Sequence, residues 1–65
     1  MAKFRILEEK ILEDGKRYIY AAGIKGDEKP VGDFVTGSMC LEYDDDNEKL
    51  IPYFYNETIS DWGKA

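Results

Sequence analysis

Residues 39–55 read MCLEYDDDNEKLIPYFY, and this stretch decides the fold because it holds two strand-like runs on either side of an acidic turn region. In the first run, Met39, Leu41 and Tyr43 occupy alternate positions. Alternation with a period of two is typical of a β-strand that buries one face. The second run is rich in aromatic residues, which favour the same structure. We therefore predict a β-hairpin.

A symmetric hairpin fixes the register of the two strands. Its cross-strand pairs are Tyr43 with Leu50, Leu41 with Pro52, and Met39 with Phe54. All six side chains are apolar, so we expect their side, together with Val35, to be the core. The opposite side then carries Thr36, Ser38, Cys40 and Glu42. Pro52 has no backbone N–H, which predicts an edge position or a nitrogen turned to solvent for the last strand.

The same register places Ile51, Tyr53 and Tyr55 on the face turned away from that predicted core. Tyr is rigid, amphipathic and frequent at binding hot spots, so this Tyr-rich face is a candidate partner-binding surface. Two plainer interpretations compete with it. The C-terminal tail could cover this face, with Trp62 packed on Tyr53, or a second copy of the chain could do so.

Acidic residues between positions 42 and 48 account for the whole net charge of −5, because the other nine acidic residues balance nine basic ones. The acidic residues of this segment are Glu42, Asp44, Asp45, Asp46 and Glu48. We expect them to orient a basic partner and count them with the Tyr-rich face as candidate partner-binding residues. The plainer interpretation is a solvated loop that discourages pairing at a strand edge.

Metal, cofactor and catalytic sites are not predicted. An EF-hand loop starting at Asp44 would need Gly and Glu where the chain has Lys49 and Tyr55. The chain has no His, and Cys40 is its single cysteine, which argues against a transition-metal site and against an activated nucleophile. The glycines lack the spacing of a phosphate-binding loop. We expect a protein that is not an enzyme.

The N-terminal half predicts a second hairpin. Asp14 and Gly15 are typical of a two-residue type I′ turn, which would set Ile11 opposite Tyr18. Phe4 and Leu7 would then fall on different faces, so we expect a bulge near Glu8. The same residues, 4–13, allow an alternative helix, since apolar side chains recur there at intervals of three and four.

Residues 16–24 are apolar on both faces, which predicts a central strand, and residues 25–33 predict a mobile loop. The expected fold is all-β, or β-rich with a short C-terminal helical turn beginning at Ser60. It is a small antiparallel meander of about four strands, a single layer or partly closed barrel, in one domain over residues 1–65. The alternative is an α+β fold with an N-terminal helix.

The net charge and the composition argue against several classes of function. A net charge of −5 without a basic stripe disfavours direct nucleic-acid binding. No apolar run approaches the roughly 20 residues of a membrane span, and no signal peptide is evident, so we expect a cytoplasmic protein. The predicted function is a small acidic interaction module that binds a protein partner, or itself as a homodimer, through the Tyr-rich face or an edge strand. The alternative is an acidic nucleic-acid mimic that inhibits a DNA- or RNA-binding protein.

Overall fold

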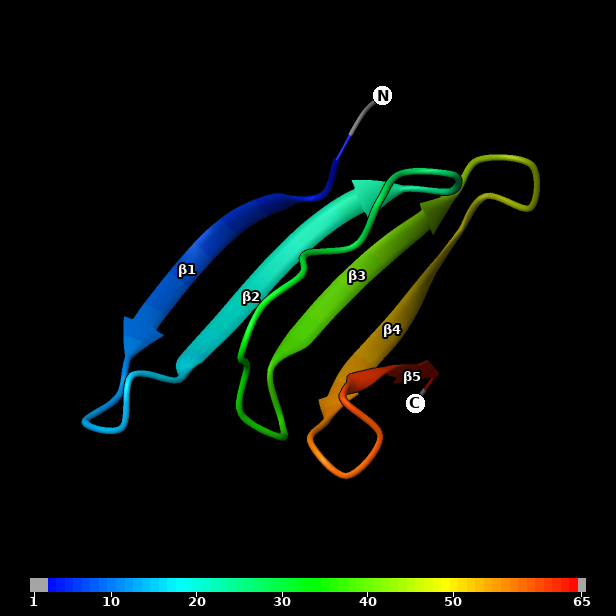
Figure 1. The fold of residues 1–65 in the computed structure, drawn as a ribbon. Helices are drawn as coiled ribbons and strands as arrows, with labels where there is room; N and C mark the ends of the chain where they lie inside the picture. Colours follow the sequence, from blue (N-terminus) through cyan, green and yellow to red (C-terminus); the bar gives the residue numbers. More distant parts are fainter. Residues whose placement is uncertain (1–2, 65) are drawn as a thin grey trace.

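A computed structural model describes residues 3–64, which form one open sheet of five strands (Figure 1). The strands are β1 (Arg5–Ile11), β2 (Arg17–Ile24), β3 (Met39–Asp44), β4 (Lys49–Asn56) and β5 (Asp61–Lys64). They lie side by side in chain order. The all-β prediction is confirmed, and the sheet does not close on itself.

Two details of the predicted meander are corrected. The sheet has a fifth strand, β5, where a helical turn was an alternative, because the chain reverses after Asn56 and pairs back onto β4. Strands β2 and β3 are parallel, whereas the other neighbours are antiparallel. A parallel pair needs a crossover connection, and residues 25–38 provide it. The helix considered for residues 4–13 is instead strand β1, which pairs with β2 over most of its length.

The β1–β2 hairpin differs from prediction by one residue in register. Ile11 lies opposite Arg17 and not Tyr18. The amide of Leu12 donates to the carbonyl of Lys16 at 2.8 Å, and Gly15 donates back to Leu12 at 3.0 Å, so the loop holds one residue more than a type I′ turn. Gly15 has a φ of 87°, the left-handed conformation that closes such longer hairpin loops. The predicted bulge is confirmed, since the register shifts between Ile6 and Glu8.

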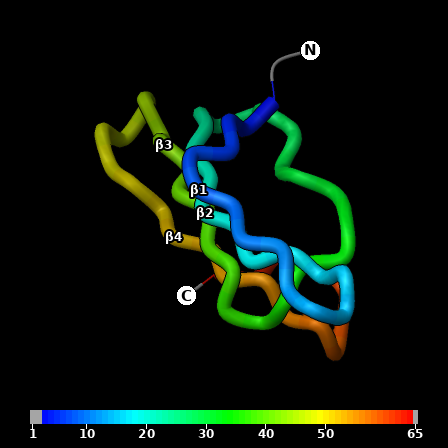
Figure 2. Tube along the Cα trace, turned by 90° about the vertical axis from the view of Figure 1, so that its left-hand side faces the viewer, coloured from blue at the N-terminus to red at the C-terminus, as the bar shows by residue number. Residues whose placement is uncertain are grey.

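The β3–β4 register is confirmed pair for pair, but the core lies on the opposite face from the one predicted. Ser38 and Cys40 are fully buried, whereas Tyr43 and Phe54 remain 38% and 42% exposed. The reason is the crossover. Residues 25–38 pass over one side of the sheet, as Figures 1 and 2 show. Phe34 of this segment packs there with Ile19 and Tyr55, which makes the side that carries Cys40 the core.

The core is small and largely aromatic. Its buried apolar residues are Phe4, Ile19, Ala21, Phe34, Cys40 and Tyr55. Trp62 of β5 completes it, with its ring 5.2 Å from Tyr55 and 5.6 Å from Phe34 between centroids. The indole N–H of Trp62 donates to the carbonyl of Pro30 at 3.0 Å. Strand β5 therefore ties the crossover to the sheet.

No helix among residues 3–64 is long and apolar enough to cross a membrane.

Candidate functional site: the open face of the sheet

The side of the sheet opposite the crossover is apolar and has no covering segment among the described residues. We call it the open face. Its residues are Tyr18, Tyr20, Ala22 and Ile24 of β2, Met39, Leu41 and Tyr43 of β3, and Leu50, Pro52 and Phe54 of β4. In Figure 2 the crossover lies on the right of the sheet, and this face is on the left.

Cross-strand pairing arranges most of these side chains in three rows. The rows are Ile24, Tyr43 and Leu50; then Ala22, Leu41 and Pro52; then Tyr20, Met39 and Phe54. Neighbours within a row lie directly opposite one another on adjacent strands, so their side chains form a continuous surface. No charged side chain interrupts the three rows.

Five of these residues are substantially exposed. Tyr18, Ile24, Tyr43, Leu50 and Phe54 keep between 38% and 60% of their surface accessible. At about 200 Å² for a large side chain, these five alone expose about 500 Å². Patches of that size are at the upper end for monomers and commonly mark interaction sites. The open face is therefore the strongest candidate for a functional surface.

Charged residues border the open face on both edges. On β1, the residues opposite Ala22, Tyr20 and Tyr18 are Arg5, Glu8 and Lys10. On the other edge, Asp61 of β5 lies opposite Asn56. One border thus has two basic side chains around one acidic side chain, and the other has an acidic side chain.

The Tyr-rich face predicted as a partner site is the covered side of the sheet. Tyr55 is 8% exposed and donates its hydroxyl to the carbonyl of Gly32 at 3.5 Å. Tyr53 packs with Trp62 against the core, as the tail-cover interpretation expected, while Ile51 is half-buried. Burial raises the pKa of the Tyr53 hydroxyl.

Lys29 of the crossover covers Tyr53. Its ammonium lies 4.2 Å from the centre of the Tyr53 ring and 3.5 Å from a carboxylate oxygen of Glu42. Glu42 in turn accepts a hydrogen bond from the Tyr53 hydroxyl at 3.3 Å. Glu42 is only 8% exposed, so this member of the predicted acidic surface is part of the cover over the core.

Within the acidic loop, Asp44 stabilises the turn itself. Its carboxylate accepts hydrogen bonds from the amides of Asp46 and Asn47 and from the Asn47 side chain, at 2.8 to 3.3 Å. The Asn47 side chain, foremost, lowers the pKa of Asp44. Lys25 adds ion pairs at 3.9 Å to Asp44 and 3.4 Å to Asp46.

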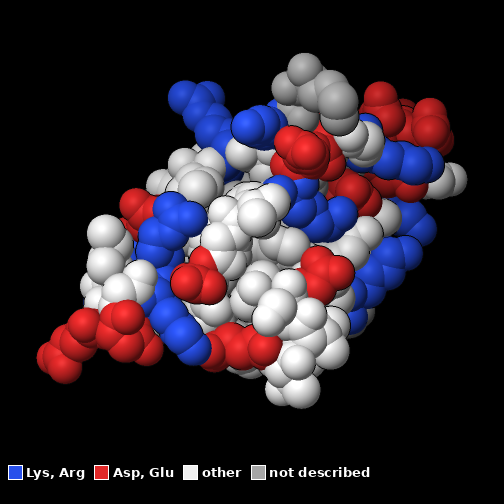
Figure 3. Space-filling model, in the orientation of Figure 1, with Lys and Arg blue, Asp and Glu red and all other residues white. Residues whose placement is uncertain are grey.

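The carboxylates of Asp44, Asp45 and Asp46 lie within 4.8 Å of one another, the spacing of a possible cation site. The turn and Lys25 already engage the carboxylates of Asp44 and Asp46, which gives these two side chains a structural role. Asp45 and Glu48 are exposed. On the covered side, basic and acidic side chains lie interleaved around an uncharged centre (Figure 3).

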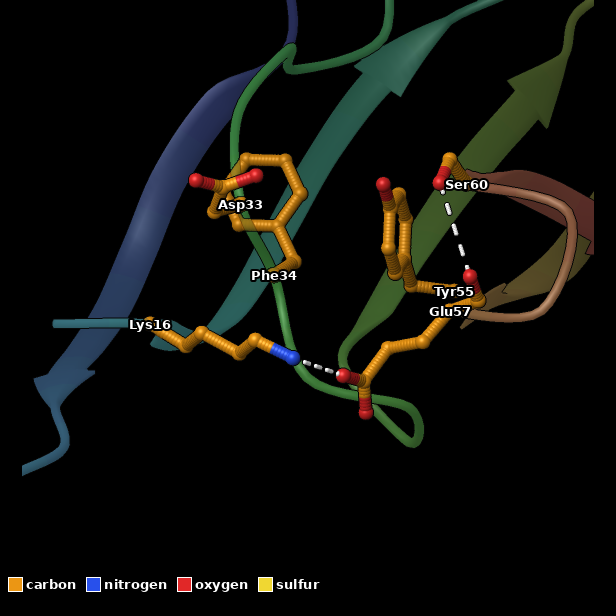
Figure 4. Close-up of a pocket in the computed structure, with 6 residues that line it drawn as sticks. All are labelled: Lys16, Asp33, Phe34, Tyr55, Glu57 and Ser60. Carbon is orange, nitrogen blue, oxygen red and sulfur yellow. Dashed lines mark hydrogen bonds and ion pairs between the residues drawn. The ribbon is translucent and has the colours of Figure 1, made fainter. Parts of the chain in front are cut away.

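Two small cavities lie beside the core on the covered side. The first, of about 80 Å³, is lined by Lys16, Asp33, Phe34, Tyr55, Glu57 and Ser60 (Figure 4). The second, of about 180 Å³, lies between the crossover and β5 near Val31 and Trp62. Small-molecule sites usually enclose about 300 to 1,000 Å³, so both cavities are below that range.

Cys40 has the environment of a structural residue. It is fully buried, and burial raises the pKa of its thiol to about 11. The thiol therefore stays protonated at neutral pH, in which form it is a poor nucleophile.

Comparison of the chain with protein-family models, with curated proteins and with solved structures finds no match. The alternation of residues 39–43 separates the two faces of β3. It does not indicate which of the two faces the crossover covers. The signal that could have identified the covered face was Gly23, since a glycine inside a strand often marks a close approach of another segment.

Proposed function

We propose that this protein is a small interaction module whose open face binds a protein surface. The observation that carries the proposal is the extent of the open face, where three apolar rows on adjacent strands stay accessible while the opposite side holds the core. Burial of apolar area provides most of the favourable free energy of protein association.

The composition of the open face also supports the proposal. Tyr, Phe and Met are enriched at the centres of protein interfaces, and charged residues are depleted there. Tyr20, Met39 and Phe54 form one of the rows, and Arg5, Lys10 and Asp61 lie at the borders. An apolar centre with a charged rim is the arrangement found at specific interfaces.

Matched variants test this function. Leu50→Lys and Phe54→Lys place a charge on the open face, whereas Val31→Lys places the same charge at a 90% exposed position on the crossover. Chemical cross-linking captures the complexes that the wild-type protein forms with itself or with other proteins. We expect the two open-face variants to lose these complexes and Val31→Lys to keep them. Circular dichroism of each variant serves as the control that it is folded. Complexes that persist in both open-face variants would rule this surface out.

The nucleic-acid mimic stays a prediction. A mimic needs an uninterrupted array of carboxylates, while here Lys25 and Lys29 pair with Asp44, Asp46 and Glu42. This pairing favours the interaction module.

A further inference from the structure

We propose that the occupant of the open face is a second copy of this chain, packed face to face about a twofold axis that runs parallel to the strands over β3. The inference rests on the proposed function, because it names the partner of the same surface. Its basis is the area of the open face and the arrangement of charges at its two borders.

The area fits a small dimer. A standard interface buries about 800 Å² on each partner. The five most exposed side chains of the open face supply about 500 Å² of that, at about 200 Å² for a large side chain. The half-buried members of the three rows and the border side chains would add to it. Two sheets packed in this way form a sandwich, with the strands of the two copies nearly aligned.

The proposed axis brings unlike strands together. Rotation about a line over β3 and parallel to the strands sets β2 of one copy against β4 of the other, and β1 against β5. The rotation does not change the position of a residue along the strands. Each apolar row of one copy therefore packs against the same row of the other copy. Ile24 then faces Leu50 of the partner copy, and Tyr20 faces its Phe54. Residues of β3 meet their own equivalents at the axis.

The border charges match across the same axis. Lys10 lies opposite Tyr18, one row beyond Tyr20. Asp61 lies opposite Asn56, which is likewise one row beyond Phe54. The two charged side chains are therefore at the same level on opposite edges. The rotation sets Lys10 of each copy against Asp61 of the other, which gives two symmetry-related ion pairs.

A face-to-face twofold axis that is perpendicular to the strands and level with Glu8 opposes like charges. It would set β1 against β1, with Glu8 facing Glu8 and Arg5 facing Lys10 of the partner copy. Like charges that face each other across an interface disfavour that arrangement. The border charges thus favour the axis parallel to the strands over this perpendicular one.

A charge-swap experiment tests the inference. Sedimentation equilibrium from micromolar to millimolar concentration should give a wild-type mass that rises towards that of a dimer. Lys10→Glu or Asp61→Lys alone should weaken dimerisation about tenfold, since two attractions become two repulsions. The double variant Lys10→Glu with Asp61→Lys should restore it. Phe54→Lys should weaken it by at least about a hundredfold, and Val31→Lys should leave it unchanged.

Three results would overturn the inference. The first is a wild-type monomer at every concentration. The second is tighter dimerisation of Lys10→Glu, because a glutamate at that position would face Arg5 across the perpendicular axis. The third is a double variant as weak as the single ones. A monomer that still cross-links to another protein through the open face would end the inference and leave the proposed function intact.

Discussion

At the scale of single residues, Ser38 joins two strands where the backbone ladder is interrupted. Its fully buried hydroxyl accepts a hydrogen bond from the amide of Ile19 at 3.2 Å and donates to the carbonyl of Arg17 at 3.5 Å. The backbone of Ser38 also accepts from the amide of Tyr55 at 2.8 Å. One small polar side chain thus satisfies backbone groups that the parallel β2–β3 pair, which begins at Tyr20 and Met39, does not reach.

Replacement of Ser38 by Ala should therefore lower the free energy of unfolding by about 1 to 3 kcal/mol, the cost of a buried amide without an acceptor. Ser60→Ala is the control, because Ser60 is exposed and its change should stay within about 0.5 kcal/mol. Urea denaturation followed by circular dichroism measures both. Equal effects of the two substitutions would contradict the role of the Ser38 hydroxyl.

The packing of the Phe4 ring requires a glycine at position 23. A Cβ atom at position 23 would lie 2.6 Å from Cγ of the Phe4 ring, so Gly23→Ala forces the ring away from the core. We expect a loss of about 1 to 3 kcal/mol in the free energy of unfolding, which is typical of overpacking. Gly63→Ala is the matched control, since nothing lies within 4 Å of its Cβ position. Thermal unfolding of the two variants distinguishes them, and a Gly23→Ala protein as stable as Gly63→Ala would exclude the contact.

At the scale of elements, a side-chain clamp holds the crossover to the end of β4. The Glu57 carboxylate accepts a hydrogen bond from the amide of Thr36, and the Thr36 hydroxyl accepts one from the amide of Glu57, both at 2.9 Å. Glu57 also pairs with Lys16, the residue just before β2. The clamp therefore connects three parts of the chain that lie far apart in sequence.

The clamp makes stability depend on pH. The hydrogen bond from Lys16, followed by the amide of Thr36, lowers the pKa of Glu57 from 4.5 to about 2. A lowered pKa contributes stability above the unfolded value of 4.5, and this contribution is lost as the pH falls towards 2. The gap in urea midpoint between wild type and Glu57→Gln should thus be full at neutral pH and close between pH 4.5 and 2. Glu13→Gln, in the β1–β2 turn, controls for the loss of a charge. A gap that does not change with pH would contradict the clamp.

The strands also show how much of the fold could be predicted from the sequence. Alternation and the acidic turn were enough to give the β3–β4 register, because short-range pairing is encoded by neighbouring residues. The predicted β1–β2 register was wrong by one residue. An Asp14–Gly15 sequence fits a two-residue turn, but it also fits a longer loop with Gly15 in the left-handed region. The parallel pairing of β2 and β3 depends on how residues 25–38 cross the sheet, which no local pattern specifies.

At the scale of the whole molecule, the route of the crossover decides which face is the core and which face is free. By covering the side that carries Cys40, it turns the predicted core residues Leu41 and Tyr43 into members of the open face, and it buries Tyr55. The candidate site was therefore missed in the sequence for the same reason that the core was placed on the wrong side. Within β3 and β4 the residues of both faces were correctly grouped and only their roles were exchanged. Val35 and Thr36, which were grouped with them, lie in the crossover instead.

The central claim, that the open face is the contact surface between two copies of the chain, is tested most directly by the molar mass of the wild-type protein across concentration, measured beside Phe54→Lys. We expect the wild-type mass to rise towards twice the monomer value as concentration increases, while Phe54→Lys stays monomeric and folded. A wild-type protein that remains monomeric at millimolar concentration, or a Phe54→Lys variant that dimerises equally well, would contradict self-association through this face.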